Sequence, residues 1–214
     1  NEVNRFLSAT DSMGVAACKG MGKTFLLKAK RMQMQKNHSV LFLPKNRLVD
    51  VSGTVYIDKM HMSFLSSYSN WTSIWLSCIC IYILSLENFA NIIDFDEKQE
   101  LPESVQQLLR KENDGIFNVF HKILNWKSKE KLNEIVRASG ILFDYVQRIQ
   151  QSVVLFVDKL EEPFNRGYYS IPGDSSSAHG KYNSSIWAYA QLAFSEAVYI
   201  LFSARHHIKI FFSI

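Results

Sequence analysis

A short glycine-containing segment carries the side chains of this sequence that are best suited to chemistry. Residues 17–24 read ACKGMGKT. Backbone N–H groups can surround a phosphate only where the chain turns tightly, and Gly20 and Gly22 permit such a turn. Lys23 is then expected to reach the terminal phosphates of a nucleotide, and the hydroxyl of Thr24 to bind Mg²⁺. The segment predicts a phosphate-binding loop.

The residues expected to contact the nucleotide form one continuous stretch that runs into a helix, whose positive N-terminus favours anions. They are Lys19, Gly20, Met21, Gly22, Lys23, Thr24 and Phe25. The stretch resembles a Walker A motif, except that Ala17 stands where the first Gly is expected. The alternative is a chance Gly-Lys-Thr in a surface turn. A preceding strand and a following amphipathic helix favour the motif.

A second candidate follows from the need of a phosphate-binding loop for a carboxylate that helps to hold Mg²⁺. Residues 153–158 read VVLFVD, five apolar residues that end in Asp158, as in a Walker B strand buried on both faces. We therefore expect Thr24 and Asp158 to hold the metal. Lys159 occupies the position where simple Walker B motifs have a catalytic Glu.

Two further acids follow on the predicted loop. Glu161 or Glu162 would polarise the attacking water, so these two and Lys23 are the predicted catalytic residues. Charges on a solvated surface loop are the open alternative for both glutamates.

The elements that must position these residues alternate between strand and helix. Apolar runs predict strands at 13–17, 39–43 and 153–157, and helical periodicity predicts helices at 23–35 and 184–204. Strand, glycine loop, helix and strand form a βαβ unit, so we expect an α/β fold with a parallel sheet. A last strand is predicted from residue 208 to the final residue, 214.

A long stretch without charge lies between these elements. Residues 60–86 contain no Asp, Glu, Lys or Arg, and Trp71–Leu86 is strongly apolar. Polar residues interrupt it and it falls short of a comfortable bilayer span of about 20 apolar residues. We expect a buried core helix, with a membrane segment as the alternative.

The segment from Leu101 to Gln151 is predicted to be helical and amphipathic. Pro102 suits a first helical position, and Gly140 suits a stop between two helices. We therefore predict a helical insertion at residues 98–151, between one part of the core at 1–97 and the remainder at 152–214.

The resemblance extends to the AAA+/STAND group of P-loop ATPases, including NACHT-type and KAP ATPases, and rests on residues 20–24, 153–162 and 208–214. It implies ATP and Mg²⁺ as cofactors and a nucleotide-driven conformational or assembly switch, as in bacterial antiphage defence ATPases. It also implies a polar sensor residue on the strand next to Walker B, for which Ser213 is the candidate. A sensor Arg would lie beyond residue 214, so we expect the chain to be part of a larger ATPase.

Partners and alternatives follow from the same resemblance. The expected partners are a nucleotide and a second copy of the chain or an effector protein. A non-hydrolysing nucleotide-gated scaffold and a membrane-associated KAP-like ATPase are the alternatives.

Composition agrees with a folded intracellular domain. The chain has 214 residues, 47% of them hydrophobic, and a net charge of +4 from 24 basic and 20 acidic residues. Intrinsic disorder is excluded, and the mild charge gives nucleic acid only weak support. The basic residues on helix 23–35 are interpreted mainly as a solvated face. Three cysteines without a metal or disulfide pattern indicate a cytoplasmic location.

Overall fold

The computed structural model describes residues 2–16, 18, 20–35, 40–43, 59–110, 113–158, 160, 179–204 and 207–214. The strands are β1 (Met13–Val15), β2 (Val40–Leu43), β3 (Ser152–Val157) and β4 (Ile208–Ser213). The helices are α1 (Glu2–Ser8), α2 (Lys23–Met34), α3 (Lys59–Leu65), α4 (Tyr68–Leu84), α5 (Phe95–Glu100), α6 (Glu103–Leu109), α7 (Ile116–Leu124), α8 (Lys129–Gln147) and α10 (His179–Ala204). The protein is a mixed α/β protein.

The strands form one parallel sheet with the order β1-β4-β3-β2. Neighbouring parallel strands require crossover connections, and helices occupy these connections here. In this order, β1, the strand before the glycine loop, lies beside β4, the last strand in the sequence. The expected parallel sheet is confirmed, and the last strand lies beside β3 as the resemblance implied.

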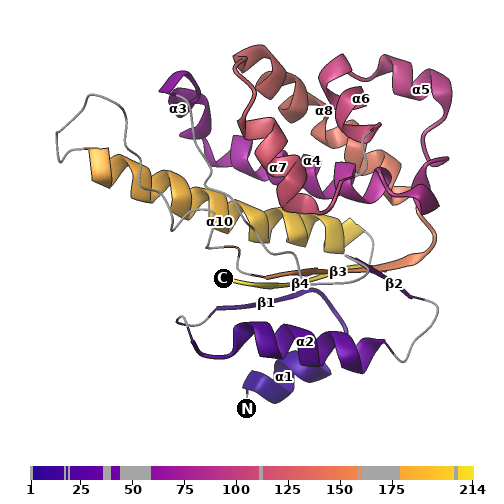
Figure 1. Ribbon diagram of the computed structural model, residues 1–214, viewed down its shortest axis with the longest axis vertical. Helices are drawn as coiled ribbons and strands as arrows, with labels where there is room; N and C mark the ends of the chain where they lie inside the picture. Colours follow the sequence, from indigo (N-terminus) through magenta and orange to yellow (C-terminus); the bar gives the residue numbers. More distant parts are fainter. Residues whose placement is uncertain are drawn as a thin grey trace.

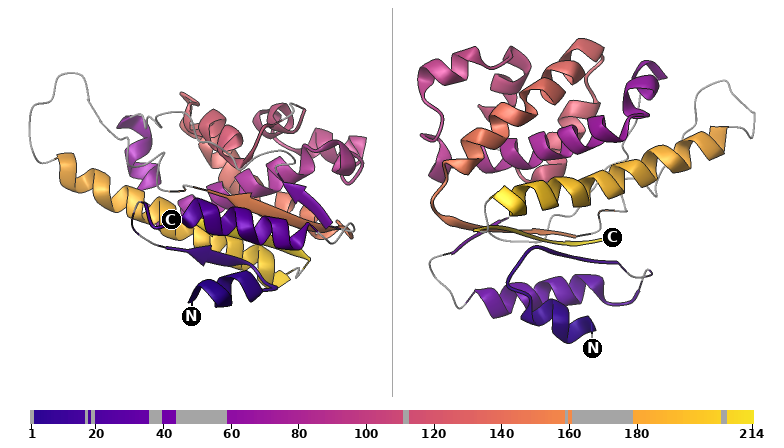
Figure 2. Two further views of the ribbon diagram at one scale, coloured as in Figure 1. Left: turned by 60° about the horizontal axis from the view of Figure 1, so that its bottom comes forward. Right: turned by 180° about the vertical axis from the view of Figure 1, so that it is seen from behind.

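Helices cover both faces of the sheet (Figure 1; Figure 2, right). On one face, α1 and α2 pack over Val154, Phe156 and Phe211. On the other, a second set of strand residues shares one core with α10 and residues of other helices; the set is Val153, Leu155, Val157, Ile208, Ile210 and Phe212. Alternate residues of a strand point to opposite faces, so an unbroken apolar run is what a strand covered on both sides requires.

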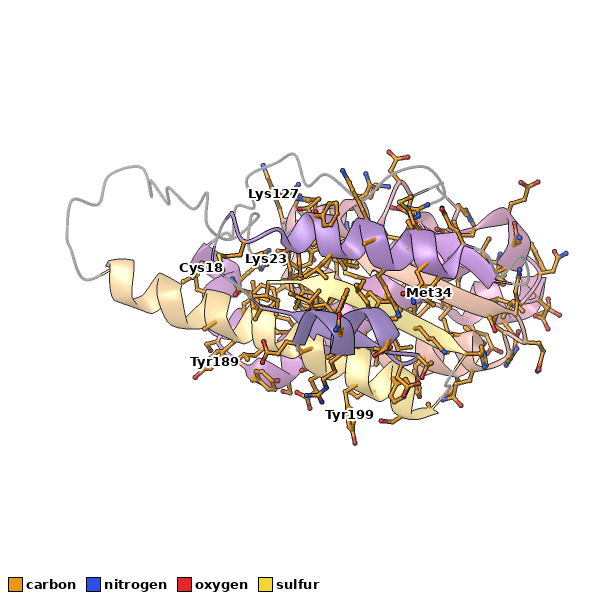
Figure 3. All side chains as sticks on the ribbon, turned by 90° about the horizontal axis from the view of Figure 1, so that it is seen from below. Cys18, Lys23, Met34, Lys127, Tyr189 and Tyr199 are labelled. Carbon is orange, nitrogen blue, oxygen red and sulfur yellow. The ribbon has the colours of Figure 1, made fainter. Side chains whose placement is uncertain are left out.

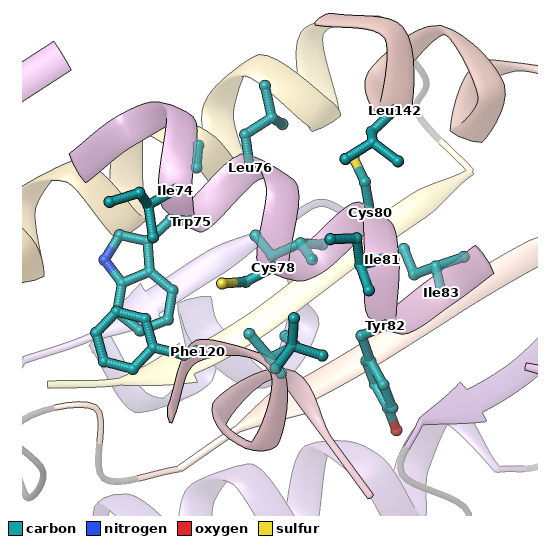
Figure 4. Packing of buried hydrophobic residues seen from close by; sticks show 14 of the residues in the cluster. Ile74, Trp75, Leu76, Cys78, Cys80, Ile81, Tyr82, Ile83, Phe120 and Leu142 are labelled. Atoms are coloured by element: carbon teal, nitrogen blue, oxygen red, sulfur yellow. The ribbon is translucent and has the colours of Figure 1, made fainter. Parts of the chain in front are cut away.

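Helix α4 is the centre of the helical layer and is buried along most of its length. Trp75 stacks on Phe120 with ring centroids 4.1 Å apart (Figure 4). It also meets Phe194 edge-on, with centroids 5.2 Å apart. Its indole Nε1 donates to the carbonyl of Ala190 at 2.7 Å, so the buried N–H has a hydrogen-bond partner. The prediction of a buried core helix is confirmed. Among the described helices, none has the length and apolar character needed to span a bilayer.

Two predictions about helix ends were wrong. Gly140 lies inside α8 rather than between two helices. The buried stripe of α8 runs past it at helical spacing, from Leu132 and Ile135 to Leu142, and packing of that stripe outweighs the weak helix propensity of one glycine. Pro102 caps α6 and its first helical residue is Glu103.

The helical layer begins earlier in the chain than the predicted insertion. The boundary expected at residue 98 falls inside α5, and α4, which precedes it, packs against α7 and α8. Several predicted edges differ by one to five residues; for example, β1 ends at Val15, α2 ends at Met34 and α10 begins at His179.

An aromatic residue fixes the position of β1 against its neighbour. A Cβ at Gly14 would lie 2.5 Å from the Phe212 ring of β4. Phe212 in turn meets Phe194 of α10 edge-on, with centroids 5.2 Å apart. Glycine at position 14 therefore allows β1 to approach a ring that belongs to the helical core.

Candidate functional site

Three parallel strands end side by side at one edge of the sheet. Val15 pairs with Ser213, and Val157 pairs with Phe212, so Asp158 lies next to Ser213 in the row. Neighbouring strands are about 4.8 Å apart, which places the backbones of Val15 and Asp158 about 10 Å apart. The glycine loop and the Walker B-like carboxylate therefore leave the same edge, with only β4 between them.

Both glycines of the loop adopt a backbone conformation that other residues rarely adopt. Gly20 has φ 88° and Gly22 has φ 81°, both in the left-handed region. Apart from the chain neighbours, no atom of the described residues lies within 4 Å of a Cβ built on either glycine, so glycine is required by the backbone conformation and not by close packing. The Met21 N–H donates to the Cys18 carbonyl at 3.2 Å, which closes a tight turn ahead of α2.

The start of α2 presents groups that suit an anion. Its first turn contains no acidic residue. Gly22 is the N-cap residue, and no described side chain makes a capping hydrogen bond there. The first N–H groups of a helix lack partners within the helix, so they are open to an external acceptor. Lys23 and Thr24 are half-buried here, and Cys18 and Lys23 lie together at this end of the helix, with Met34 at the other (Figure 3).

Two predicted nucleotide contacts point outwards. The side chains of Met21 and Phe25 are 71% and 75% exposed. Large apolar groups gain little from such exposure, so these two side chains are not part of the core of the domain.

Asp158 is a buried carboxylate held by a neighbouring strand. It is 3% exposed, and the Ser213 hydroxyl donates to its Oδ1 at 2.6 Å. The Leu160 N–H donates to the Ser213 carbonyl at 3.0 Å, which ties the chain after Asp158 to the end of β4. The Ile214 N–H donates to the Val15 carbonyl at 2.9 Å on the other side. The end of β4 thus joins the glycine loop strand to the segment that carries Asp158.

Several predicted residues lie outside the described part of the chain. These are Ala17 and Lys19 in the loop, and Lys159, Glu161 and Glu162 after β3. The roles predicted for them stay predictions. The structure brings together the described members of the set, the loop from Gly20 to Thr24 and Asp158, at one edge.

The interpretation of the basic residues of α2 as a solvated face was wrong for two of them. Lys30 is 3% exposed and Arg31 is 9% exposed. The Lys30 Nζ donates to the carbonyls of Leu7 and Ala9, and burial lowers the pKa of Lys30, with a smaller contribution from Lys209. Lys30 therefore fastens the end of α1 to α2 and does not add to a basic surface.

Sequence reasoning missed one contact of β1. The Ser12 hydroxyl accepts a hydrogen bond from the Ile210 N–H at 2.9 Å. This hydrogen bond adds one side-chain contact to the pairing of the three-residue strand β1 with β4. Its only sequence signal is a serine directly before an apolar strand, which is too common to be specific.

The described candidate metal ligands at this edge are two oxygen donors, the Thr24 hydroxyl and the Asp158 carboxylate. Among the described residues there is no group of three or more His, Cys, Asp and Glu that could hold a metal. Mg²⁺ is usually bound by one or two protein oxygens together with water and substrate phosphates. Both candidate ligands are therefore of the type that Mg²⁺ prefers.

Comparison with known proteins adds no family to this geometry. No protein-family model matches the chain, and neither a curated protein nor a solved structure is significantly similar to it.

Proposed function

We propose that this chain is an ATP-binding, Mg²⁺-dependent P-loop ATPase module of the AAA+/STAND type. One observation carries the proposal: a glycine loop with two left-handed glycines and a buried carboxylate leave the same edge of a parallel sheet, on either side of β4. A phosphate-binding loop and a metal-binding carboxylate must act on the same triphosphate, so they must share an edge.

Each described residue has a defined part in this proposal. The N–H groups of the loop and of the start of α2 bind the phosphates, and the Lys23 ammonium contacts the terminal ones. The Thr24 hydroxyl and the Asp158 carboxylate hold the metal. Bound Mg²⁺ neutralises charge on the phosphate oxygens.

Hydrolysis also requires a group that orients water. Glu161 and Glu162 are the candidates, and the sequence alone supports them. The Lys23 ammonium adds positive charge where negative charge develops during in-line attack. The base specificity for adenine is part of the proposal through the family resemblance.

The biological role is proposed from the resemblance alone. Nucleotide binding would drive a conformational or assembly switch in a larger ATPase, with a second copy of the chain or an effector protein as partner, in bacterial antiviral defence. A cytoplasmic location belongs to the same proposal.

The decisive experiment compares two lysines of α2. Lys23→Ala should weaken binding of a fluorescent ATP analogue about 10- to 100-fold, because it removes charge-assisted contacts to phosphate. Lys28→Ala removes an exposed lysine from the same helix and should leave binding unchanged. Absence of binding by the wild type, or equal binding by both variants, would contradict the proposal.

Phosphate release then separates the ATPase from a non-hydrolysing scaffold. The ATPase predicts steady-state release by the wild type above the rate of Lys23→Ala. The scaffold, which Lys159 at the usual Glu position would favour, predicts binding with no release above that control. Fractionation tests the membrane-associated alternative, which requires the chain in the pellet.

A further inference from the structure

Ser213 contacts described residues of the candidate site through its side chain and its main chain. Its hydroxyl donates to Asp158 Oδ1, its carbonyl accepts from the Leu160 N–H, and its backbone pairs with Val15. The residue is fully buried. Its side chain and its main chain therefore both contact the segment that carries the carboxylate.

Asp158 is the buried acidic residue of the candidate site. The carboxylate is almost completely buried, yet no described basic side chain forms an ion pair with it. Its Oδ1 accepts from the neutral Ser213 hydroxyl at 2.6 Å. Buried carboxylates are usually paired with a cation or bound to a metal, because an isolated buried charge is costly.

These two observations complement each other. A hydrogen bond to one carboxylate oxygen fixes the rotation of the group and leaves the other oxygen in a set direction. We propose that Ser213 is a positioning residue for metal binding: it holds Asp158 Oδ1 so that Oδ2 faces the Mg²⁺ that accompanies the nucleotide. The inference rests on the proposed function, and it gives Ser213 a role through Asp158 instead of through direct contact with the γ-phosphate.

The test measures how much Mg²⁺ tightens nucleotide binding. Affinity for a fluorescent ATP analogue is measured for the full chain in excess Mg²⁺ and in EDTA, and the ratio of the two dissociation constants is the magnesium effect. Ser213→Ala should reduce this ratio about tenfold, as is typical when a contact that orients a metal ligand is lost. The affinity in EDTA should stay within about twofold. Ser213→Thr keeps a hydroxyl and should restore most of the ratio.

A matched control separates positioning from stability. Ser77 is also fully buried, and its hydroxyl donates to the Ile135 carbonyl at 3.1 Å in the helical layer. Ser77→Ala also removes a buried hydroxyl bond, so it should lower thermal stability without changing the magnesium effect. Thermal unfolding of each variant with and without Mg²⁺ and nucleotide gives a second readout, which is independent of turnover.

The outcomes distinguish this inference from the proposed function. A wild type that binds no nucleotide overturns both. A wild type that binds with a magnesium effect that Ser213→Ala leaves intact overturns the positioning role alone. An equal loss of affinity in Mg²⁺ and in EDTA would show that Ser213 acts on the nucleotide directly, and this also rejects the inference. If Ser213→Ala does not fold, Ser213→Cys takes its place, because a thiol is only a weak hydrogen-bond donor. A reduced magnesium effect in a folded Ser213→Cys supports the positioning role, and an unchanged one overturns it.

Discussion

Helices α2 and α4 have opposite relations to the rest of the protein. α4 has no charged side chain, and almost every residue of it is buried among α7, α8 and α10. α2 has no acidic residue, has several basic ones, and exposes large apolar groups at Phe25 and Met32. Packing against other elements therefore stabilises α4 along its whole length, whereas it stabilises only one face of α2.

The same difference separates the helical layer from the edge that carries the candidate site. In the helical layer, aromatic contacts and satisfied indole N–H groups leave little freedom. At the edge, two left-handed glycines and a few hydrogen bonds from the end of β4 set the geometry. Substitutions in the layer should alter the stability of the whole domain, and substitutions at the edge should mainly alter ligand binding.

The largest effect on stability is expected from Trp75→Ala. The side chain is fully buried, stacks on Phe120 and donates to the Ala190 carbonyl. Its loss should lower the free energy of unfolding by about 3–5 kcal/mol, from the cavity and the unpaired carbonyl. Denaturant unfolding measures this change. Tyr199→Ala, at a residue of α10 that is 68% exposed, should change the value by less than about 0.5 kcal/mol; similar losses in both variants would remove the contrast between buried and exposed aromatics.

A smaller effect of opposite signs is expected from one substitution made at two glycines. Gly22→Ala forces a side chain into the left-handed region and should cost about 1–2 kcal/mol. Gly140→Ala lies inside α8 with open space around it and should add about 0.5–1 kcal/mol. Thermal unfolding of the two variants beside the wild type compares them directly. A Gly22→Ala variant at least as stable as the wild type would mean that the positive φ of Gly22 does not require glycine.

The smallest effect is expected at an exposed ion pair within the helical layer. Glu97 accepts from Arg148 at 2.7 and 2.9 Å, and these hydrogen bonds, with that from the Asp94 backbone, lower the pKa of Glu97 below its ordinary 4.5. A lowered folded-state pKa means that the contribution is present above pH 4.5 and is lost as the pH falls through the folded value.

Glu97→Gln tests that sign. The variant should melt slightly below the wild type at pH 7, and the difference should vanish in acid, where the wild-type carboxyl is protonated. Arg148→Gln removes the same pair from the other side and should give the same pH trend, with an added loss from its contact with Tyr145. A difference that stays constant with pH would attribute the effect to helix capping alone.

Much of the fold could be predicted because its elements have strong local signals. The apolar run before Asp158 predicts a strand buried on both faces, and the charge-free stretch from Trp71 predicts a core helix. Phosphate binding needs a tight turn in the loop, which predicts that its glycines adopt conformations open to glycine, and both have positive φ.

The remaining features depend on contacts between distant residues. A local pattern gives Gly140 a weak helix propensity, but it does not show that the residues of one helix face are buried on both sides of the glycine. The burial of Lys30 depends on the end of α1, whose carbonyls it reaches from more than 20 positions away. The bond from Ser213 to Asp158 depends on strand register, which side-chain types alone do not determine.

The close approach of Gly14 to Phe212 has a consequence for how this sequence can evolve. The ring occupies the place where any other residue at position 14 would put its Cβ, and it is also held by Phe194. A larger residue at 14 becomes acceptable only when the ring at 212 shrinks, and a smaller residue at 212 opens space that a side chain at 14 can fill. We therefore expect these two positions, almost two hundred residues apart in the chain, to covary among descendants of this gene.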